Sequence, residues 1–237
     1  MPAITMSRVT LDVSMVYHPW MSSQPHQSSS SGHTCMLTGV VVGLDISTSI
    51  VGLSILSPDG TLISLDCIDL RKLTTTWEKL DAVEAFLLGI LRIHGPVSQC
   101  FVEENLKAFR DGFSSATTLV ALARFNGMTS ASARRLFVCD PQYVDFGAAR
   151  RALNIAIVPE KKCGVSPKQQ IHEQVAKMIP SWQWRMKTLS AGPRKGLTVL
   201  DEVCYDMADA YVVARAGLLG VGPAGKKPKK KSGKKAV

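Results

Sequence analysis

Short apolar runs separated by turn residues dominate the chain just after residue 37. Residues 38–46 and 51–56 are mostly apolar and flank a Ser-Thr-Ser turn, and residues 61–68 follow Pro58-Asp59-Gly60. Proline, aspartate and glycine in succession are a strong turn signal. Runs of this length and spacing predict three strands in an antiparallel meander, with a hairpin at 57–60.

Apolar residues then recur at three- and four-residue spacing, which predicts helices. The first predicted helix covers residues 77–94, and its repeat comprises Leu80, Val83, Leu87, Leu88 and Leu91. Gly95-Pro96 ends it. Further helices are expected at 114–135, 145–153 and 198–218, and one that Ser166-Pro167 opens and that runs to about residue 178. Thr198 and Asp201 resemble a capping box at the start of the last helix.

Short apolar runs between these helices predict further strands at 98–103, 136–139 and 155–158, and residues 181–197 are expected to form a loop. The order is three strands, helix, strand, helix, strand and then helices. It predicts a single α/β domain whose mixed sheet has three antiparallel strands followed by parallel ones, with helices on its faces.

The length and composition of the chain agree with one folded domain and two tails. The chain has 237 residues, of which 46% are hydrophobic, and we expect a leader at 1–35, a folded domain at 36–221 and a basic tail at 222–237. The six cysteines show neither CxxC nor zinc-site spacing, which favours small buried side chains in a reducing compartment. No apolar run reaches the ~18 residues of a membrane helix, so no membrane association is expected.

Charge is concentrated at the C-terminus. Seven lysines between Lys226 and Lys235 account for most of the net charge of +9 and leave +2 for the rest of the chain. Such a tail can bind phosphates without reading sequence, and a solubility tail or a nuclear address is the alternative. The leader is rich in Ser and has one acid, Asp12, and one arginine, Arg8. This favours a mitochondrial or other organelle address, unless Met36 begins the functional chain, and the lysine tail leaves the nucleus open.

Carboxylates occur in apolar surroundings at three separate places. Asp45 interrupts the apolar strand that begins the domain, Glu103 and Glu104 end the strand at 98–103, and Asp206 and Asp209 are the only charges between Val203 and Ala214. An ionised carboxylate in an apolar environment is costly unless it binds something. The i, i+3 spacing also places Asp206 and Asp209 on one side of a helix.

A divalent cation is the simplest reason to gather these acids. Hard oxygen ligands favour Mg²⁺ or Mn²⁺ over zinc. Two ions about 4 Å apart can activate water and stabilise the leaving oxygen in phosphodiester hydrolysis. Each acid alone has an ordinary explanation as a cap, a turn former or a solvated side chain. As an ordered set, Asp45, the pair Glu103 and Glu104, and the pair Asp206 and Asp209 predict a catalytic metal site.

These motifs resemble those of the RuvC-type Holliday junction resolvases, members of the ribonuclease H-like superfamily. Gly43-Leu44-Asp45 with the turn that follows is similar to the opening strand of that family, Phe101-Val102-Glu103 to its second catalytic strand, and Asp206-Met207-Ala208-Asp209-Ala210 to its closing helix. The resemblance covers about residues 38–220. It implies a ribonuclease H-like mixed sheet and a Mg²⁺- or Mn²⁺-dependent endonuclease, with two ions per active site, that resolves four-way DNA junctions.

The resemblance also implies roles for individual residues. Asp45, Glu103, Asp206 and Asp209 would be the metal ligands, and Lys168 would face the scissile phosphate. Arg150 and Arg151, in a short helix before Lys168, would contact nucleic acid. Glu104 departs from the family pattern and could replace Glu103 if the strand register differs by one. The family has an aromatic wedge just after the catalytic glutamate. This chain has Leu106 there, with Phe109 and Phe113 further along, so the wedge residue stays open.

The family works as a homodimer, and Ala121-Leu122-Ala123-Arg124 resembles the helix that helps to build it. The same helix carries a stripe of mostly small residues that would let two helices approach: Ala116, Leu119, Val120, Ala123 and Gly127. A two-fold dimer would place one active site at each of the two strands to be cut. The alternative is that the stripe packs on the sheet.

Two other functions fit part of the pattern. A non-catalytic protein of the same fold could bind RNA or the ribosome through its basic tail, although all four acids are present. Asp45-Ile46-Ser47-Thr48-Ser49 also resembles the first phosphate loop of actin-like ATPases and sugar kinases. Those proteins need a second sheet domain and a second glycine-rich loop, for which this chain is too short.

Overall fold

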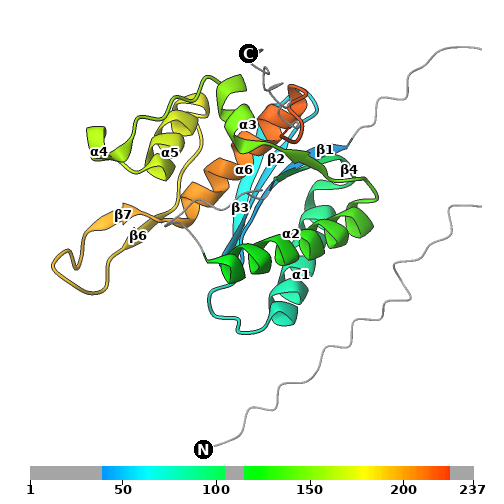
Figure 1. The fold of residues 1–237 in the computed structure, drawn as a ribbon, viewed down its shortest axis with the longest axis horizontal. Helices are drawn as coiled ribbons and strands as arrows, with labels where there is room; N and C mark the ends of the chain where they lie inside the picture. Colours follow the sequence, from blue (N-terminus) through cyan, green and yellow to red (C-terminus); the bar gives the residue numbers. More distant parts are fainter. Residues whose placement is uncertain (1–38, 105–114, 225–237) are drawn as a thin grey trace, which may run out of the picture. The chain divides into compact units, whose positions relative to one another are not determined.

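The computed structural model describes residues 39–104 and 115–224 (Figure 1). Several predictions fall outside these ranges: the leader at 1–35, Leu106, Phe109 and Phe113 as wedge candidates, and the lysines of the tail. The organelle address expected from the leader and the phosphate binding expected from the tail therefore stay predictions.

A five-stranded mixed sheet forms the centre of the described chain. β1 (Val40–Ile46), β2 (Ile50–Leu56) and β3 (Leu62–Asp69) pair antiparallel, whereas β4 (Val97–Glu103) runs parallel to β1 and β5 (Gln142–Val144) runs parallel to β4. The strand order is β3-β2-β1-β4-β5. This confirms the predicted mixed sheet, with three antiparallel strands followed by parallel ones.

Helices cover both faces of the sheet (Figure 1). α1 (Thr76–His94) and α2 (Ala116–Phe137) pack on one face, and α6 (Val203–Leu218) packs on the other with α3 (Phe146–Ala152) and α5 (Pro167–Met178) beside it. Along β1 the side chains alternate. Val42 and Leu44 belong to the core under α1 and α2, and Val41 belongs to the core under α6. Asp45 therefore points to the α6 face.

Two glycines allow α6 to lie very close to the sheet. A Cβ at Gly43 would be 2.4 Å from the carbonyl oxygen of Ala210, and one at Gly52 would be 2.1 Å from the carbonyl oxygen of Asp206. Gly52 pairs with Asp45 across β1 and β2. Because Gly52 has no side chain, the first turn of α6 can settle directly beside Asp45.

Three local predictions were wrong. The strand expected at 136–139 is the end of α2 and its left-handed C-cap, Val138, and β5 follows it. Residues 155–158 form neither strand nor helix. The loop expected at 181–197 contains β6 (Met186–Thr188), which pairs with β7 (Thr198–Leu200), so that α6 begins at Val203 and Thr198 lies in a strand.

A short helix that the pattern does not predict, α4 (Glu160–Cys163), precedes α5. The start of α5 agrees with the prediction, because the Ser166 hydroxyl caps it and Pro167 occupies its first turn. No helix within residues 39–104 and 115–224 combines the length and the apolar composition that a membrane crossing requires.

Candidate active site

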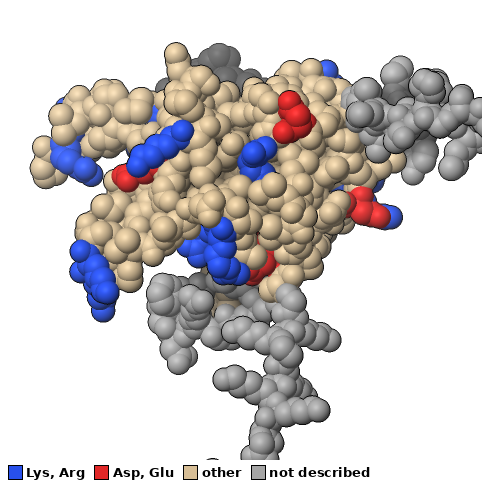
Figure 2. Space-filling view, turned by 90° about the horizontal axis from the view of Figure 1, so that it is seen from above, with Lys and Arg blue, Asp and Glu red and all other residues tan. Residues whose placement is uncertain are grey.

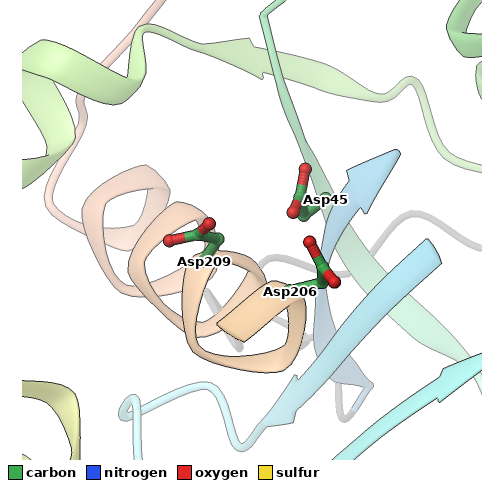
Figure 3. Close-up of side chains that lie close together, drawn as sticks. All are labelled: Asp45, Asp206 and Asp209. Carbon is green, nitrogen blue, oxygen red and sulfur yellow. The ribbon is translucent and has the colours of Figure 1, made fainter. Parts of the chain in front are cut away.

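Three of the four predicted acids converge where β1 meets the first two turns of α6 (Figure 3). One carboxylate oxygen from each of Asp45, Asp206 and Asp209 lies within 4.8 Å of the others. Asp206 and Asp209 are only 7% and 6% exposed, and Asp45 is partly buried. Their i, i+3 spacing points both helix acids toward the strand, as the sequence predicted. We call these three residues the acid cluster.

Glu103 lies beside the acid cluster, on the neighbouring strand. β4 runs parallel to β1 with Val102 paired to Leu44, so Glu103 follows at the level of Asp45. The carboxyl groups of Glu103 and Asp45 share a hydrogen bond. The next residue makes a different contact: Glu104 Oε2 accepts a hydrogen bond of 2.7 Å from the backbone N–H of Ala224. Of the two register alternatives, the structure brings Glu103 onto Asp45.

Asp45 and Asp209 of the acid cluster, and Glu103 beside it, hold their protons more tightly than ordinary carboxyl groups do. Burial, followed by the charge of Asp206, raises the pKa of Asp45 to about 6, although Lys168 and the hydrogen bond from Glu103 oppose this. Burial and the charge of Asp45 raise the pKa of Glu103 and of Asp209 well above their usual values. Negative charges this close in a poorly solvated site need a positive partner to ionise together.

Lys168 supplies part of that positive charge. Its Nζ donates a 2.7 Å hydrogen bond to Asp206 Oδ1 from the first turn of α5. Burial lowers the pKa of Lys168, but the hydrogen bond and the charges of Asp206, Asp209 and Asp45 outweigh it, so the pKa is raised overall. The side chain is 57% exposed. A charged ammonium group therefore stands at the open side of the acid cluster, where an incoming phosphate can reach it.

The two predicted arginines of α3 differ in position. The charge of Arg150 acts on Asp209, where it lowers the pKa, and the Arg150 guanidinium lies 5.7 Å from the centre of the Phe146 ring. Its Nε is buried without a hydrogen-bond partner among the described residues. Arg151 instead lies 3.9 Å from Asp145. Arg150 is thus the arginine of this pair whose charge acts on the acid cluster.

A cavity of about 170 Å³ adjoins the acid cluster on the side of α2. Asp45, Glu103 and Glu104 line it together with five further residues: Ile46, Ser47, Leu119, Leu122 and Asn126. Of these five, Asn126 is the one that was not singled out from the sequence. Asn126 is 2% exposed, and its Nδ2 donates a 3.3 Å hydrogen bond to the carbonyl oxygen of Glu103. A buried amide in an apolar helix was the available signal for Asn126.

The turn after Asp45 is held by hydrogen bonds. The Ser47 hydroxyl donates to the Ile50 carbonyl and accepts from the Ile50 N–H, and Lys79 Nζ donates to the Thr48 carbonyl at 2.7 Å. These contacts fix the end of β1 and with it the backbone that carries Asp45. No sequence pattern pointed to Lys79, which lies on α1, 31 residues from Thr48.

The donor set fits a hard divalent cation. The acid cluster offers oxygen ligands alone, and Asp209 Oδ1 is buried without a hydrogen-bond partner among the described residues. Buried polar atoms normally have partners. A bound Mg²⁺ or Mn²⁺ would give this oxygen one and would remove the repulsion between the carboxylates. Within the described chain, this is the site suited to metal-assisted hydrolysis.

Comparisons with known proteins find similarity among solved structures only. No family model matches the chain, and no curated protein matches it. The chain is similar to RuvC of T. thermophilus in complex with a Holliday junction substrate, at 14% identity and a TM-score of 0.49, over 77% of this chain and 94% of that one. RuvC of Thermus thermophilus in a second structure is 16% identical, with a TM-score of 0.46 over 77% and 98% of the two chains.

The yeast mitochondrial Holliday junction resolvase Ydc2 is 13% identical, with a TM-score of 0.43, over 76% of this chain and 78% of that one. Because all three structures have at most 16% identity to this chain, its function is inferred from its own residues.

Proposed function

We propose that this chain is a metal-dependent endonuclease that hydrolyses phosphodiester bonds in branched DNA, with the four-way junction as its substrate. The observation that carries the proposal is the acid cluster. Three carboxylates from a strand and a helix lie within 4.8 Å of one another, and the pKa values of Asp45 and Asp209 are raised. Burying several carboxylate charges so close together is energetically unfavourable unless a cation neutralises them.

Each residue then has a chemical task. Asp45, Asp206 and Asp209 would hold the cations, with Glu103 completing the ligand set from β4. The chemistry that bound Mg²⁺ or Mn²⁺ would supply is activation of a water molecule and stabilisation of the leaving oxygen. Lys168 turns from Asp206 toward a non-bridging oxygen of the scissile phosphate and stabilises the charge that develops there. Arg150 balances the negative charge near Asp209 and binds an adjacent phosphate.

The choice of a four-way junction as substrate rests on a proposed homodimer. A four-way junction has two equivalent strands to cut, and a two-fold homodimer presents one active site to each. The proposed interface is the outer side of α2, where Ala116, Ala123 and Gly127 are exposed and Val120 is 67% exposed. Phe125 and Ala133 fill the inner side. Leu119, which the sequence placed in the same stripe, is not part of this proposed interface, because it lines the cavity beside the acid cluster.

The test uses purified protein and a synthetic four-way junction, with linear duplex, three-way junction and flap DNA as comparisons. Products are resolved on a denaturing gel with Mg²⁺ or with EDTA. We expect symmetrical nicks in the four-way junction with Mg²⁺ and none with EDTA. Asp45→Asn and Asp209→Asn should abolish cleavage and leave junction binding unchanged or tighter, because less negative charge then opposes the phosphate.

Asp140→Asn is the matched control, because the Asp140 side chain is 83% exposed and pairs with Arg134 at the end of α2. It should cleave like the wild type. Wild-type rates in Asp45→Asn or Asp209→Asn would refute the metal-ligand assignment. Junction binding without cleavage by the wild type in Mg²⁺ or Mn²⁺ would support a non-catalytic nucleic-acid-binding protein instead.

A further inference from the structure

Formal charge is divided unevenly between two parts of the described chain. Residues 155–200, which we call the basic module, contain eight lysines and arginines and only two acids, a charge of +6. The other described residues contain ten basic and fifteen acidic side chains, a charge of −5. Like charges gathered in one segment repel one another, so the distribution favours a negatively charged partner for the basic module.

The basic module is joined to the helix that carries two of the acids. It consists of α4, α5 and the β6–β7 hairpin, and α5 lies beside α6 (Figure 1). Lys168 pairs with Asp206, Arg185 pairs with Asp66 on β3, and Lys187 pairs with Glu202 at the start of α6. The Asp201 N–H donates a 2.9 Å hydrogen bond to the Arg185 carbonyl. The base of the hairpin therefore has a defined position next to the acid cluster.

The outer part of the basic module has no such partners. Five of its basic side chains are exposed and make no ion pair with any described residue: Lys161, Lys162, Lys177, Arg194 and Lys195. Figure 2 shows lysines and arginines on the left half of the visible face, where α4, α5 and the hairpin lie in Figure 1. These cations are available to a ligand.

Backbone hydrogen bonds hold the tip of the hairpin. The Leu189 N–H donates to the Leu197 carbonyl at 3.0 Å, and the Gly196 N–H donates to the Leu189 carbonyl at 2.8 Å. Gly192 and Gly196 have φ of 78° and 88°, a region that glycine adopts without strain. Leu197 is nevertheless 54% exposed. The turn thus presents Arg194 and Lys195 outward on a closed loop without a core of its own.

We propose that the basic module binds the phosphate backbone of a double-stranded DNA arm as this arm leaves the acid cluster. In this proposal, the DNA arm contacts Lys168 next to the acid cluster and contacts α4 and the tip of the hairpin further out. The choice of DNA rests on the proposed function. The preference for a polyanion rests on the charge distribution alone. A row of exposed cations without buried base-reading groups suits backbone contacts, which position DNA without specifying its sequence.

The experiment measures binding to duplex and four-way junction DNA in EDTA, over a range of salt concentrations. Lys161→Ala/Lys162→Ala and Arg194→Ala/Lys195→Ala remove two charges each from the outer basic module. Each pair should weaken binding roughly tenfold at low salt and lower the log–log salt slope by up to about 1.8. Arg92→Ala, an exposed arginine at the end of α1, is the control and should change neither. All variants keep the lysine tail, so its contribution cancels.

A second comparison uses two variants in which one arginine is replaced by glutamate. Arg194→Glu and Arg92→Glu alter the net charge equally, and only Arg194→Glu should weaken binding strongly. Equal affinities and slopes in the basic-module variants and the Arg92 variants would overturn the proposal. Binding of wild type to heparin but not to DNA would overturn the choice of partner.

Because no cleavage occurs in EDTA, these outcomes are independent of the nuclease assay. DNA binding through the basic module by a chain that fails to cut would leave this inference standing and refute the proposed activity.

Discussion

Replacing Asp45 by Asn should stabilise the metal-free protein at neutral pH. The pKa of Asp45 is about 6 in the folded protein, against 3.8 as the ordinary value. A difference of about 2 pKa units corresponds to roughly 3 kcal/mol of folding free energy, at about 1.4 kcal/mol per unit. At pH 7 and above, the folded protein bears this cost of ionising Asp45 beside Asp206. The neutral amide of nearly the same shape does not.

The sign follows from proton binding. A carboxyl group with a raised pKa binds its proton more tightly in the folded state, so its contribution is fully present below pH 3.8 and is lost as the pH rises through 6. The advantage of Asp45→Asn over wild type should therefore be near zero at pH 4 and reach ~3 kcal/mol by pH 7. For a domain of this size, that corresponds to roughly 6–12 °C in Tm.

The assay is thermal and urea unfolding in EDTA from pH 4 to pH 8, followed by circular dichroism, for wild type, Asp45→Asn and Asp140→Asn. The exposed Asp140 variant should stay within about 0.5 kcal/mol of wild type throughout. Saturating Mg²⁺ or Mn²⁺ should raise the Tm of wild type and not that of Asp45→Asn. A variant that is less stable than wild type at pH 7 in EDTA, or an advantage that does not change with pH, would refute this reasoning.

Four further changes test other parts of the structure. Lys168→Ala should slow single-turnover cleavage by about 10²-fold, with partial recovery in Lys168→Arg; an unchanged rate would remove Lys168 from the reaction. Gly52→Ala should lower the free energy of unfolding by about 1–3 kcal/mol and weaken metal binding, because its Cβ would meet the Asp206 carbonyl, whereas Gly89→Ala has open space around its Cβ and should not destabilise. Ala123→Glu should give a folded monomer by light scattering that nicks junctions on one strand only, and a wild type that is monomeric with junction bound would exclude the dimer. Deletion of residues 226–237 should weaken binding to all nucleic acids and flatten its salt dependence, whereas a neutral Gly/Ser tail of equal length should not restore either.

The sequence alone was sufficient wherever a periodic pattern was long. The strands of the meander alternate or run apolar over seven or eight residues, and the helices at Thr76–His94 and Val203–Leu218 repeat over several turns, so their type was predictable. It was insufficient for short elements. Residues 136–139 are an apolar run of four that suits a strand or a helix end equally, and β6 and β7 have only three residues each.

The candidate site divides in the same way. The residue types were visible in the sequence, because an acid in an apolar strand and two acids on one side of an apolar helix are costly without a ligand. The choice between Glu103 and Glu104 depended on strand pairing. That the charge of Arg150 acts on Asp209 while Arg151 pairs with Asp145 depended on how α3 packs. Lys79 carries no local signal, since its partner Thr48 lies 31 residues away. The amide of Asn126 stands out in its helix, but its partner Glu103 lies 23 residues away and is set by packing.

What only the tertiary structure decided is the distance between charges. Asp45 and Asp206 are 161 positions apart in the sequence, and they meet because Gly43 and Gly52 let α6 lie directly on the sheet. The raised pKa of Asp45 arises from burial first and from Asp206 second, and neither exists in the unfolded chain. The sequence supplies the carboxylates and their spacing within each element. Only packing removes their water and brings them within 4.8 Å, which turns ordinary acids into a site that favours a metal ion.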